Sequence, residues 1–134
     1  MFTVKRLLTV VLLTINMVGI ASAGQKRPNS LHVTATAYNS VPAQTDNTPD
    51  IAAWGDRLTP GLKAIAISRD LLKQHGLRYG DKVKIKSPDG EYLDGEYIVM
   101  DKMNARWRKK IDIYMGIDVR KAKRWGKRNV SIHW

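Results

Sequence analysis

The chain has 134 residues, with 23 Lys and Arg against 12 Asp and Glu, a formal net charge of +11, and no cysteine. The absence of cysteine excludes disulfides and thiolate metal sites, and the positive charge indicates an acidic partner such as an anionic polymer, a lipid surface or a nucleic acid. A solvated basic surface without a dedicated partner is the alternative.

Residues 1–23 are typical of a secretory signal peptide. Lys5-Arg6 precedes an apolar run over residues 7–20, and three small residues then lead to a cleavage point before Gly24. Because the run is shorter than the ~20 residues of a membrane-spanning helix, a retained anchor is the less favoured alternative. We therefore expect an exported protein, periplasmic or secreted, with no membrane span after cleavage. Export makes a nucleic acid a poor candidate for the acidic partner and favours cell-wall polymer or a membrane surface.

The remainder of the chain fits one domain. Without the signal peptide it carries 21 basic and 12 acidic residues, a formal charge of +9. Residues 24–31 are mostly polar and without apolar periodicity, which predicts a flexible lead. Residues 32–134 are close to the commonest size of a single domain, and we expect a monomer.

Alternating β-branched and apolar residues predict strands, and Gly, Pro, Asn and Asp mark the turns between them. In chain order we expect a strand over 32–38, a long polar loop over 39–59, a buried strand over 64–67, a short helix capped by Ser68, a hairpin of 81–86 and 95–100, a strand over 111–115, a helix from Asp118 to Trp125 and a strand over 128–134. Five or six short strands with two short helices favour a mainly β fold, a small closed barrel, because so few residues cannot cover both faces of an open sheet.

Two carboxylates stand out, because each is attached to a predicted strand. Asp101 ends an apolar run, which predicts a position at the rim of the barrel, and Asp112 alternates with Ile111 and Ile113, so it faces solvent or a cleft. Two neighbouring acids are the minimum for proton transfer to a sugar linkage. The alternatives are an Asp101 that binds its own turn and an Asp112 that pairs with nearby basic residues.

Other chemistry is not indicated. The three histidines show no metal-ligand spacing, and the chain has neither a Gly-x-Ser-x-Gly motif nor a glycine-rich phosphate loop, so we expect no metal and no cofactor. Trp107 follows Asp101 in a basic loop and is the tryptophan best placed to contact a ligand, whereas Trp125, at a helix end, is expected in the core.

Seven segments together resemble the 3D (Asp-Asp-Asp) domain family. They are Thr34-Ala35-Thr36-Ala37-Tyr38, Trp54-Gly55-Asp56-Arg57-Leu58, Ala64-Ile65-Ala66-Ile67-Ser68, Tyr79-Gly80-Asp81-Lys82-Val83, Asp101 with Asn104, Ile111-Asp112-Ile113-Tyr114, and Ala122 with Trp125-Gly126-Lys127-Arg128. The resemblance runs from about His32 to Trp134, and the family is similar in fold to the catalytic domain of MltA-type lytic transglycosylases.

The resemblance implies a six-stranded double-psi β-barrel that cleaves the β-1,4 bond between N-acetylmuramic acid and N-acetylglucosamine in peptidoglycan. Asp101 matches the general acid, which would then accept the proton of the muramic C6 hydroxyl and leave a 1,6-anhydro end. Asp112 matches the second family aspartate, which would hold the geometry or stabilise the transition state. The third aspartate has no direct match, because Ser68 stands in its place; Asp70 or Asp46 could take the role, or Asp70 could merely start a helix.

The expected substrate-binding residues surround these acids. Thr36 and Tyr38 share one face of the first strand and would bind substrate or orient Asp101, with core packing as the alternative. Lys102 and Arg106 could meet the carboxylates of peptide stems. The full expected set is Thr36, Tyr38, Asp46, Lys102, Asn104, Arg106 and Trp107.

Two other function classes compete with the enzyme. The first is a non-catalytic peptidoglycan-binding or wall-remodelling module of the same fold. The second is a cationic domain for nucleic acid or anionic lipid, which the lack of an aromatic-interleaved basic stripe disfavours.

Overall fold

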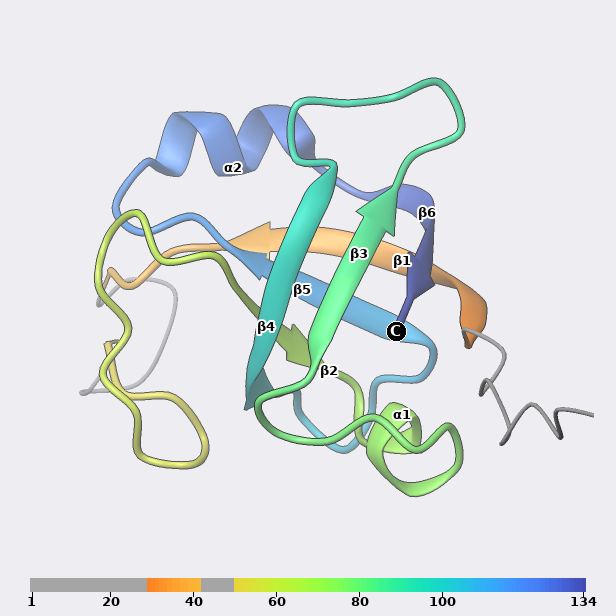
Figure 1. Ribbon diagram of the computed structural model, residues 1–134. Coiled ribbons are helices and arrows are strands. Elements are labelled where there is room, and N and C mark those ends of the chain that lie inside the picture. The colour runs from red at the N-terminus through yellow and green to blue at the C-terminus, as the bar shows by residue number, and fades with distance from the viewer. Residues whose placement is uncertain (1–28, 42–49) are drawn as a thin grey trace, which may run out of the picture.

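The computed structural model describes residues 29–41 and 50–134 (Figure 1). The predicted signal peptide, most of the predicted flexible lead and Asp46 lie outside these residues. The elements are β1 (Ser30–Tyr38), β2 (Ala64–Ile67), α1 (Arg69–Lys73), β3 (Lys82–Lys86), β4 (Gly95–Lys102), β5 (Lys110–Tyr114), α2 (Val119–Trp125) and β6 (Arg128–His133). β1 begins two residues before the predicted strand, because Ser30 and Leu31 pair with β6.

The six strands form a closed barrel in the order β1-β5-β2-β4-β3-β6. The pairs β1/β5 and β2/β4 are parallel and the other four pairs are antiparallel. The helices lie at opposite ends of the barrel, α2 at the top of Figure 1 and α1 at the bottom. The predicted mainly β fold, a small six-stranded barrel with two short helices, is confirmed.

The barrel has an internal twofold relation. If β1 is exchanged with β4, β2 with β5 and β3 with β6, the same six strand pairs result. Each parallel pair is then replaced by a parallel pair, and each antiparallel pair by an antiparallel one. The helices obey the same exchange, because α1 connects β2 to β3 and α2 connects β5 to β6. Two interlocked halves of this kind make the double-psi barrel.

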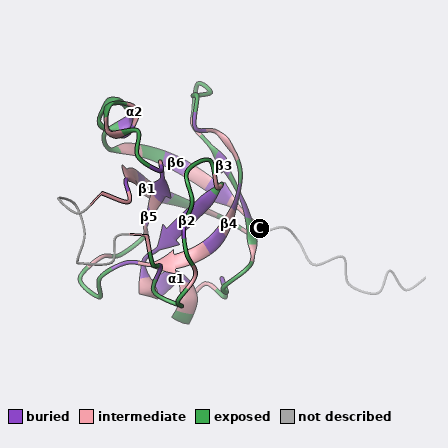
Figure 2. Ribbon diagram, turned by 90° about the vertical axis from the view of Figure 1, so that its left-hand side faces the viewer, coloured by how far each residue is buried: buried purple, intermediate pink, exposed green. Residues whose placement is uncertain are grey.

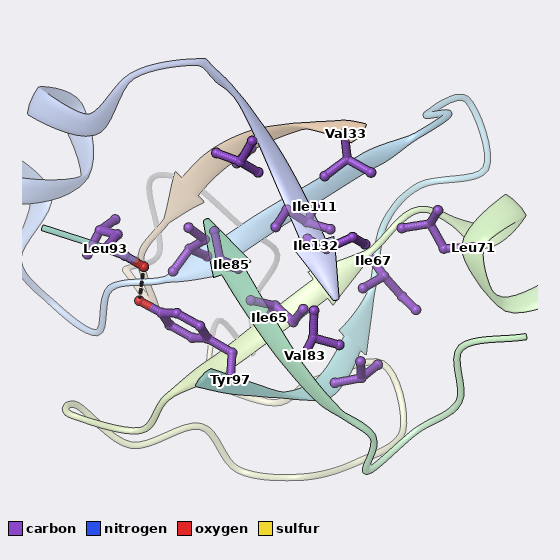
Figure 3. Close-up of a cluster of buried hydrophobic side chains, with 14 of the residues drawn as sticks. Val33, Ile65, Ile67, Leu71, Val83, Ile85, Leu93, Tyr97, Ile111 and Ile132 are labelled. Carbon is purple, nitrogen blue, oxygen red and sulfur yellow. Dashed lines mark hydrogen bonds between the residues drawn. The ribbon is translucent and has the colours of Figure 1, made fainter. Parts of the chain in front are cut away.

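The barrel interior is filled by alternate residues of the strands. On β3, for example, Val83 and Ile85 are fully buried between exposed lysines, and on β5 Ile111 and Ile113 are buried on either side of Asp112. Figure 3 shows these branched side chains meeting from all sides of the barrel, and Figure 2 shows buried and more exposed stretches along the strands. The inner faces of the six strands therefore form the core, and every second residue is left outside.

Trp125 closes one end of this core. Its ring is 2 % exposed and its Nε1 donates to the carbonyl of Ala35 at 3.2 Å. The helix that carries it begins as expected, because Asp118 accepts from the backbone N–H of Lys121 at 2.9 Å. Trp125 is thus a core residue, as the sequence predicts.

The start of α1 differs from the prediction. Ser68 occupies the N-cap position, but its side chain makes no capping hydrogen bond. Its Oγ instead accepts from the backbone N–H of Lys110 at 3.0 Å, so the hydroxyl joins β5 to the end of β2.

Within residues 29–41 and 50–134, no helix has the length and apolar character needed to cross a bilayer.

Candidate functional site

One row of residues crosses four neighbouring strands and builds the site. Asp101 of β4 pairs with Ala66 of β2, Ala66 pairs with Asp112 of β5, and Asp112 pairs with Thr36 of β1. Residues paired across strands project to the same face of a sheet. Because Ile111 and Ile113 point into the core, this row lies on the outer surface of the barrel wall.

A β-bulge brings Asp101 to that outer face. Along β4, Tyr97 and Val99 point into the core, so strict alternation would direct Asp101 inward as well. The register of the β2/β4 pair instead shifts between Ile65 and Ala66, so Met100 is an extra residue in β4. Bulges re-aim the side chains that follow them. Asp101 therefore lies on the outer wall, one residue before the end of β4 and so close to the rim.

The two acids border one cavity. Its volume is about 210 Å³, and its lining includes Asp101, Asp112 and Ala66. Since strands are spaced by about 4.8 Å, β4 and β5 stand roughly 10 Å apart on either side of β2. The methyl group of Ala66 leaves the space between the two carboxylates open.

Asp112 lies in a poorly solvated position. Burial raises the pKa of this carboxyl to about 6, with a further increase from the negative charge of Asp101. The hydrogen bond from Thr36 Oγ1 to Asp112 Oδ1, 2.9 Å long, and the charge of Lys110 act in the opposite direction. Asp112 therefore exchanges its proton near neutral pH, as acid–base chemistry requires.

Asp101 is held by donors from three segments. Its Oδ1 accepts from the backbone N–H of Ala53 at 2.7 Å and from its own neighbour, the N–H of Lys102, at 2.9 Å. Its Oδ2 accepts from Tyr38 Oη at 3.3 Å. Oδ1 is thus fixed by two backbone groups, whereas Oδ2 has one long hydrogen bond and is the more available oxygen.

Tyr38 joins the two acids electrostatically. Burial and the charges of Asp101 and Asp112 raise the pKa of the Tyr38 phenol well above its ordinary value. The phenol therefore stays neutral and donates a hydrogen bond to Asp101. The ring lines the cavity and packs against Tyr114, with 5.5 Å between the ring centroids. Thr36 and Tyr38 therefore bind the two acids, one each. Tyr38 also packs against a second apolar cluster outside the barrel interior, formed by Ala52, Leu58, Ala64 and Tyr114.

The loop between β4 and β5 forms the other side of the cavity. Trp107 lines it, with Lys110 Nζ 3.5 Å from the ring centroid and the guanidinium carbon of Arg106 at 4.7 Å. Lys102 also lines the cavity, and its Nζ lies 5.4 Å from the ring centroid of Trp54. This side of the cavity therefore presents an aromatic ring and the ammonium group of Lys102 to the two carboxylates.

The structure brings most of the predicted residues together. Tyr38, Asp101, Lys102, Asn104, Trp107 and Asp112 line the cavity, and Thr36 reaches it through its hydrogen bond to Asp112. Arg106 does not line the cavity and contributes only through its stacking on Trp107. Asp46 lies outside the described residues.

Asp70 does not line this cavity, and its contacts are structural. It is 6 % exposed, and its Oδ2 accepts from the backbone N–H of Lys109 at 2.9 Å. Burial alone would raise the pKa of Asp70, but hydrogen bonds from Ser68 and the Lys109 N–H hold it below the ordinary value. Lys109 has a positive φ of 42°, a conformation that costs a non-glycine residue energy, so Asp70 fixes a strained point of the loop.

Three contributions were missed by the sequence reasoning. Ala66 was assigned only to a buried strand, although its place between two charged neighbours depends on register. Met100 was not recognised as a bulge, because a one-residue shift leaves no compositional mark. The N–H of Ala53 reaches Asp101 across 48 positions of sequence, and the only available signal was the small-residue pair next to Trp54 in a long loop.

Scans of the chain against protein-family models and against curated protein sequences gave no match. The assignment of a function therefore depends on the geometry of the site and on the motifs quoted above.

Proposed function

We propose that this chain is a peptidoglycan lytic transglycosylase. The observation that carries the proposal is the cavity on the outer barrel wall, where Asp101 and Asp112 lie on either side of Ala66. Two carboxyl groups in different environments can divide acid and base work at one linkage. Among the described residues, no group of three or more His, Cys, Asp or Glu side chains could hold a metal ion.

In the proposed reaction the carboxyl group of Asp101 protonates the oxygen of the bond between N-acetylmuramic acid and N-acetylglucosamine, and the C1–O4 bond breaks. The resulting carboxylate accepts the proton of the muramic C6 hydroxyl while O6 bonds to C1. The products are a free 4-hydroxyl and a 1,6-anhydro end, and no water is consumed. The proton balance closes because Asp101 ends the cycle protonated, as it began.

The surroundings of Asp101 suit this role. Two backbone N–H groups fix Oδ1, so the carboxyl cannot rotate freely, and Oδ2 is available to carry the proton. Asp112, across Ala66 from Asp101, would in its ionised form stabilise the positive charge that develops on the sugar ring.

Trp107 and the surrounding lysines suit a glycan that carries acidic substituents. An aromatic face packs against the apolar face of a sugar, and the ammonium groups of Lys102 and Lys110 meet carboxylates of the peptide stems. The cavity is smaller than the ~300–1,000 Å³ typical of sites that enclose a small molecule. It therefore fits one unit of a polymer that continues beyond it.

Mass spectrometry of sacculi digested with the protein tests the proposal. We expect soluble muropeptides lighter by one water than hydrolysis products, and we expect Asp101→Asn to reduce their release by at least about 100-fold, the usual loss for a missing general acid. Asp89→Asn, in the exposed β3–β4 turn, makes the same charge change far from the cavity and should retain full release.

Two outcomes would contradict the proposal. Products that retain the water would identify a hydrolase. Tight sacculus binding without any release would identify the alternative, a non-catalytic peptidoglycan-binding or wall-remodelling module.

A further inference from the structure

A second cavity, of about 250 Å³, lies beside the start of α2. Its wall combines three tyrosine rings with two lysines, Lys63 just before β2 and Lys121 in α2. The three phenol groups are already engaged within the protein: Tyr92 Oη donates to Lys121 O at 3.0 Å, Tyr97 Oη donates to Leu93 O at 2.8 Å, and Tyr114 Oη shares a 2.9 Å hydrogen bond with Ser40 Oγ. Tyr92 is 43 % exposed and offers a ring face, whereas Tyr97 and Tyr114 are each 3 % exposed. The charged groups of the wall are the two ammonium groups and the carboxylate of Asp118.

Both ammonium groups are positioned without being neutralised. Lys63 Nζ lies 4.9 Å from the ring centroid of Tyr97, and Lys121 Nζ lies 5.7 Å from that of Tyr92. Among the described residues, ion pairs within 4.0 Å involve only the basic residues Arg57, Lys82 and Arg128. A cation over an aromatic face keeps its full charge for a third group.

More positive charge surrounds Tyr92. The guanidinium carbons of Arg124 and Arg128 lie 5.7 Å and 5.8 Å from its ring centroid. Arg128 is committed, because its Nη1 pairs with Glu91 at 2.7 Å and its Nε donates to Trp125 O at 2.9 Å. In the described part of the chain, neither Lys121 nor Arg124 forms an ion pair within 4.0 Å. Their positive charges are therefore available to an anion.

One ring pair connects this cavity with the carboxylate site. Tyr114 lines the second cavity, Tyr38 lines the cavity of Asp101 and Asp112, and the two ring centroids are 5.5 Å apart. The same two residues are register partners at the ends of β1 and β5. The two cavities therefore lie on either side of one ring pair, of which Tyr114 is buried.

We propose that the second cavity, between Lys63 and Lys121, is a subsite for a carboxylate of a peptide stem on the bound glycan. This inference rests on the proposed function, because it assumes a glycan at the Asp101 site. The exposed face of Tyr92 receives the aliphatic part of the stem, and the ammonium groups pair with its carboxylate. Among the described residues, Asp118 is the one carboxylate in the cavity wall, and its Oδ1 accepts from the Lys121 N–H.

The test is co-sedimentation with sacculi, with every protein carrying Asp101→Asn so that the polymer is not consumed. Lys63→Gln combined with Lys121→Gln should weaken binding about tenfold, as expected from the loss of two solvent-accessible ion pairs. The matched control is Lys84→Gln combined with Lys86→Gln, two exposed lysines of β3 outside the cavity, which should bind like the parent. Equal melting temperatures exclude unfolding as the cause.

Modified sacculi identify the ligand. When the stem carboxylates are amidated, or the stems are removed with an amidase, the parent should bind no better than the lysine variant on the same modified sacculi, because the contacts that Lys102 and Lys110 make with stem carboxylates are lost from both proteins alike. Unchanged binding of the variant to intact sacculi would overturn the inference. A loss that persists on stem-free glycan, or that follows removal of phosphate polymers instead of amidation, would also overturn it. These binding measurements do not depend on turnover. The subsite can therefore be disproved while the proposed transglycosylase activity is retained, and the activity can be disproved while the subsite is retained.

Discussion

The two halves of the barrel share one arrangement of strands and carry different side chains at equivalent positions. The twofold exchange that superposes β1 on β4 and β2 on β5 brings Thr36 onto Asp101 and Ala66 onto Asp112. The first half thus contributes a hydroxyl and a methyl group where the second half contributes two carboxyl groups. The bulge at Met100 is also confined to the second half, because the β1/β5 register has no shift.

This difference separates what the fold requires from what the chemistry requires. The inward residues of both halves are apolar. Ile65 of the first half and Ile113 of the second, for example, are fully buried register partners. The outward residues differ because the site needs only one pair of acids with a gap between them. A symmetrical row with four carboxylates would place like charges side by side and destabilise the barrel.

The largest effect is expected when the gap between the acids is filled. Ala66→Leu places a branched side chain in the cavity and should lower release of anhydro-muropeptides about 100-fold, the cost of displacing a reacting group by ~1 Å. Ala66→Ser keeps the space and serves as the control. Digestion of sacculi measures both, and retained activity in Ala66→Leu would contradict the assignment of this cavity.

Removal of the anchor of the β4–β5 loop should have the next largest effect, on stability. Asp70→Ala leaves the N–H of Lys109 without its acceptor, at a cost of about 2–3 kcal/mol in the free energy of unfolding. Asp70→Asn retains an acceptor and should lose less.

The pH dependence provides a second check on Asp70. Its native pKa is lowered, so its contribution is present above the ordinary pKa of Asp and is lost as pH falls through the lowered value. Denaturant titrations at pH 7 and pH 3 measure this difference. If the folded Asp70→Ala protein is inactive at low temperature, Asp70 has a catalytic role and the structural assignment is wrong.

Asp112 should have the opposite dependence on pH. Its pKa is raised to about 6, so the native state holds a proton that the unfolded chain releases near pH 4. Its contribution to stability therefore falls as pH rises from about 4 to about 6. Asp112→Asn should be more stable than the wild type by about 2–3 kcal/mol at pH 8 and unchanged at pH 3. Thermal unfolding across this range measures it, and a pH-independent difference would contradict the raised pKa.

The smallest effect concerns the hydroxyl of the first half. Thr36→Val removes the hydrogen bond to Asp112, which lowers the pKa of that carboxyl. The pKa of Asp112 should rise by about half a unit to one unit in this variant, whereas Thr36→Ser should preserve it. Carbon-13 NMR titration of the Asp112 carboxyl follows the change. An unchanged pKa would show that the 2.9 Å contact does not tune the acid.

The sequence predicts the elements well because their signals are local. Alternation with period two marks β3 and β6, and Asp118 is a recognisable helix cap. The side-chain role of Ser68 was predicted wrongly, since its hydroxyl binds Lys110, 42 positions away, and no local pattern records such a partner. Likewise, the end of an apolar run places Asp101 near the end of a strand, but this local signal does not show the one-residue bulge that turns its side chain to the outer wall.

For the site, the motifs identify the residue types but not their arrangement. Asp101, Asp112 and Trp107 could be chosen from the sequence, because acids next to apolar runs and a tryptophan in a basic loop are visible there. Their common cavity depends on β2, which lies between β4 and β5 in space although it precedes both in the chain. The contribution of Ala66 could not be predicted, since alanine is common in any buried strand.

The extra residue at Met100 makes the chemistry of this barrel separable from its architecture. If position 100 were deleted, Val99 would be followed directly by Asp101, and regular alternation would keep Asp101 on the outer face opposite Ala66. A designer could therefore delete Met100, which removes the bulge, and replace Asp101 with threonine, the residue type that the twofold exchange places at the equivalent position of β1. The same six strands could thus exist as an inert scaffold, one codon shorter, on which other surface functions could be built.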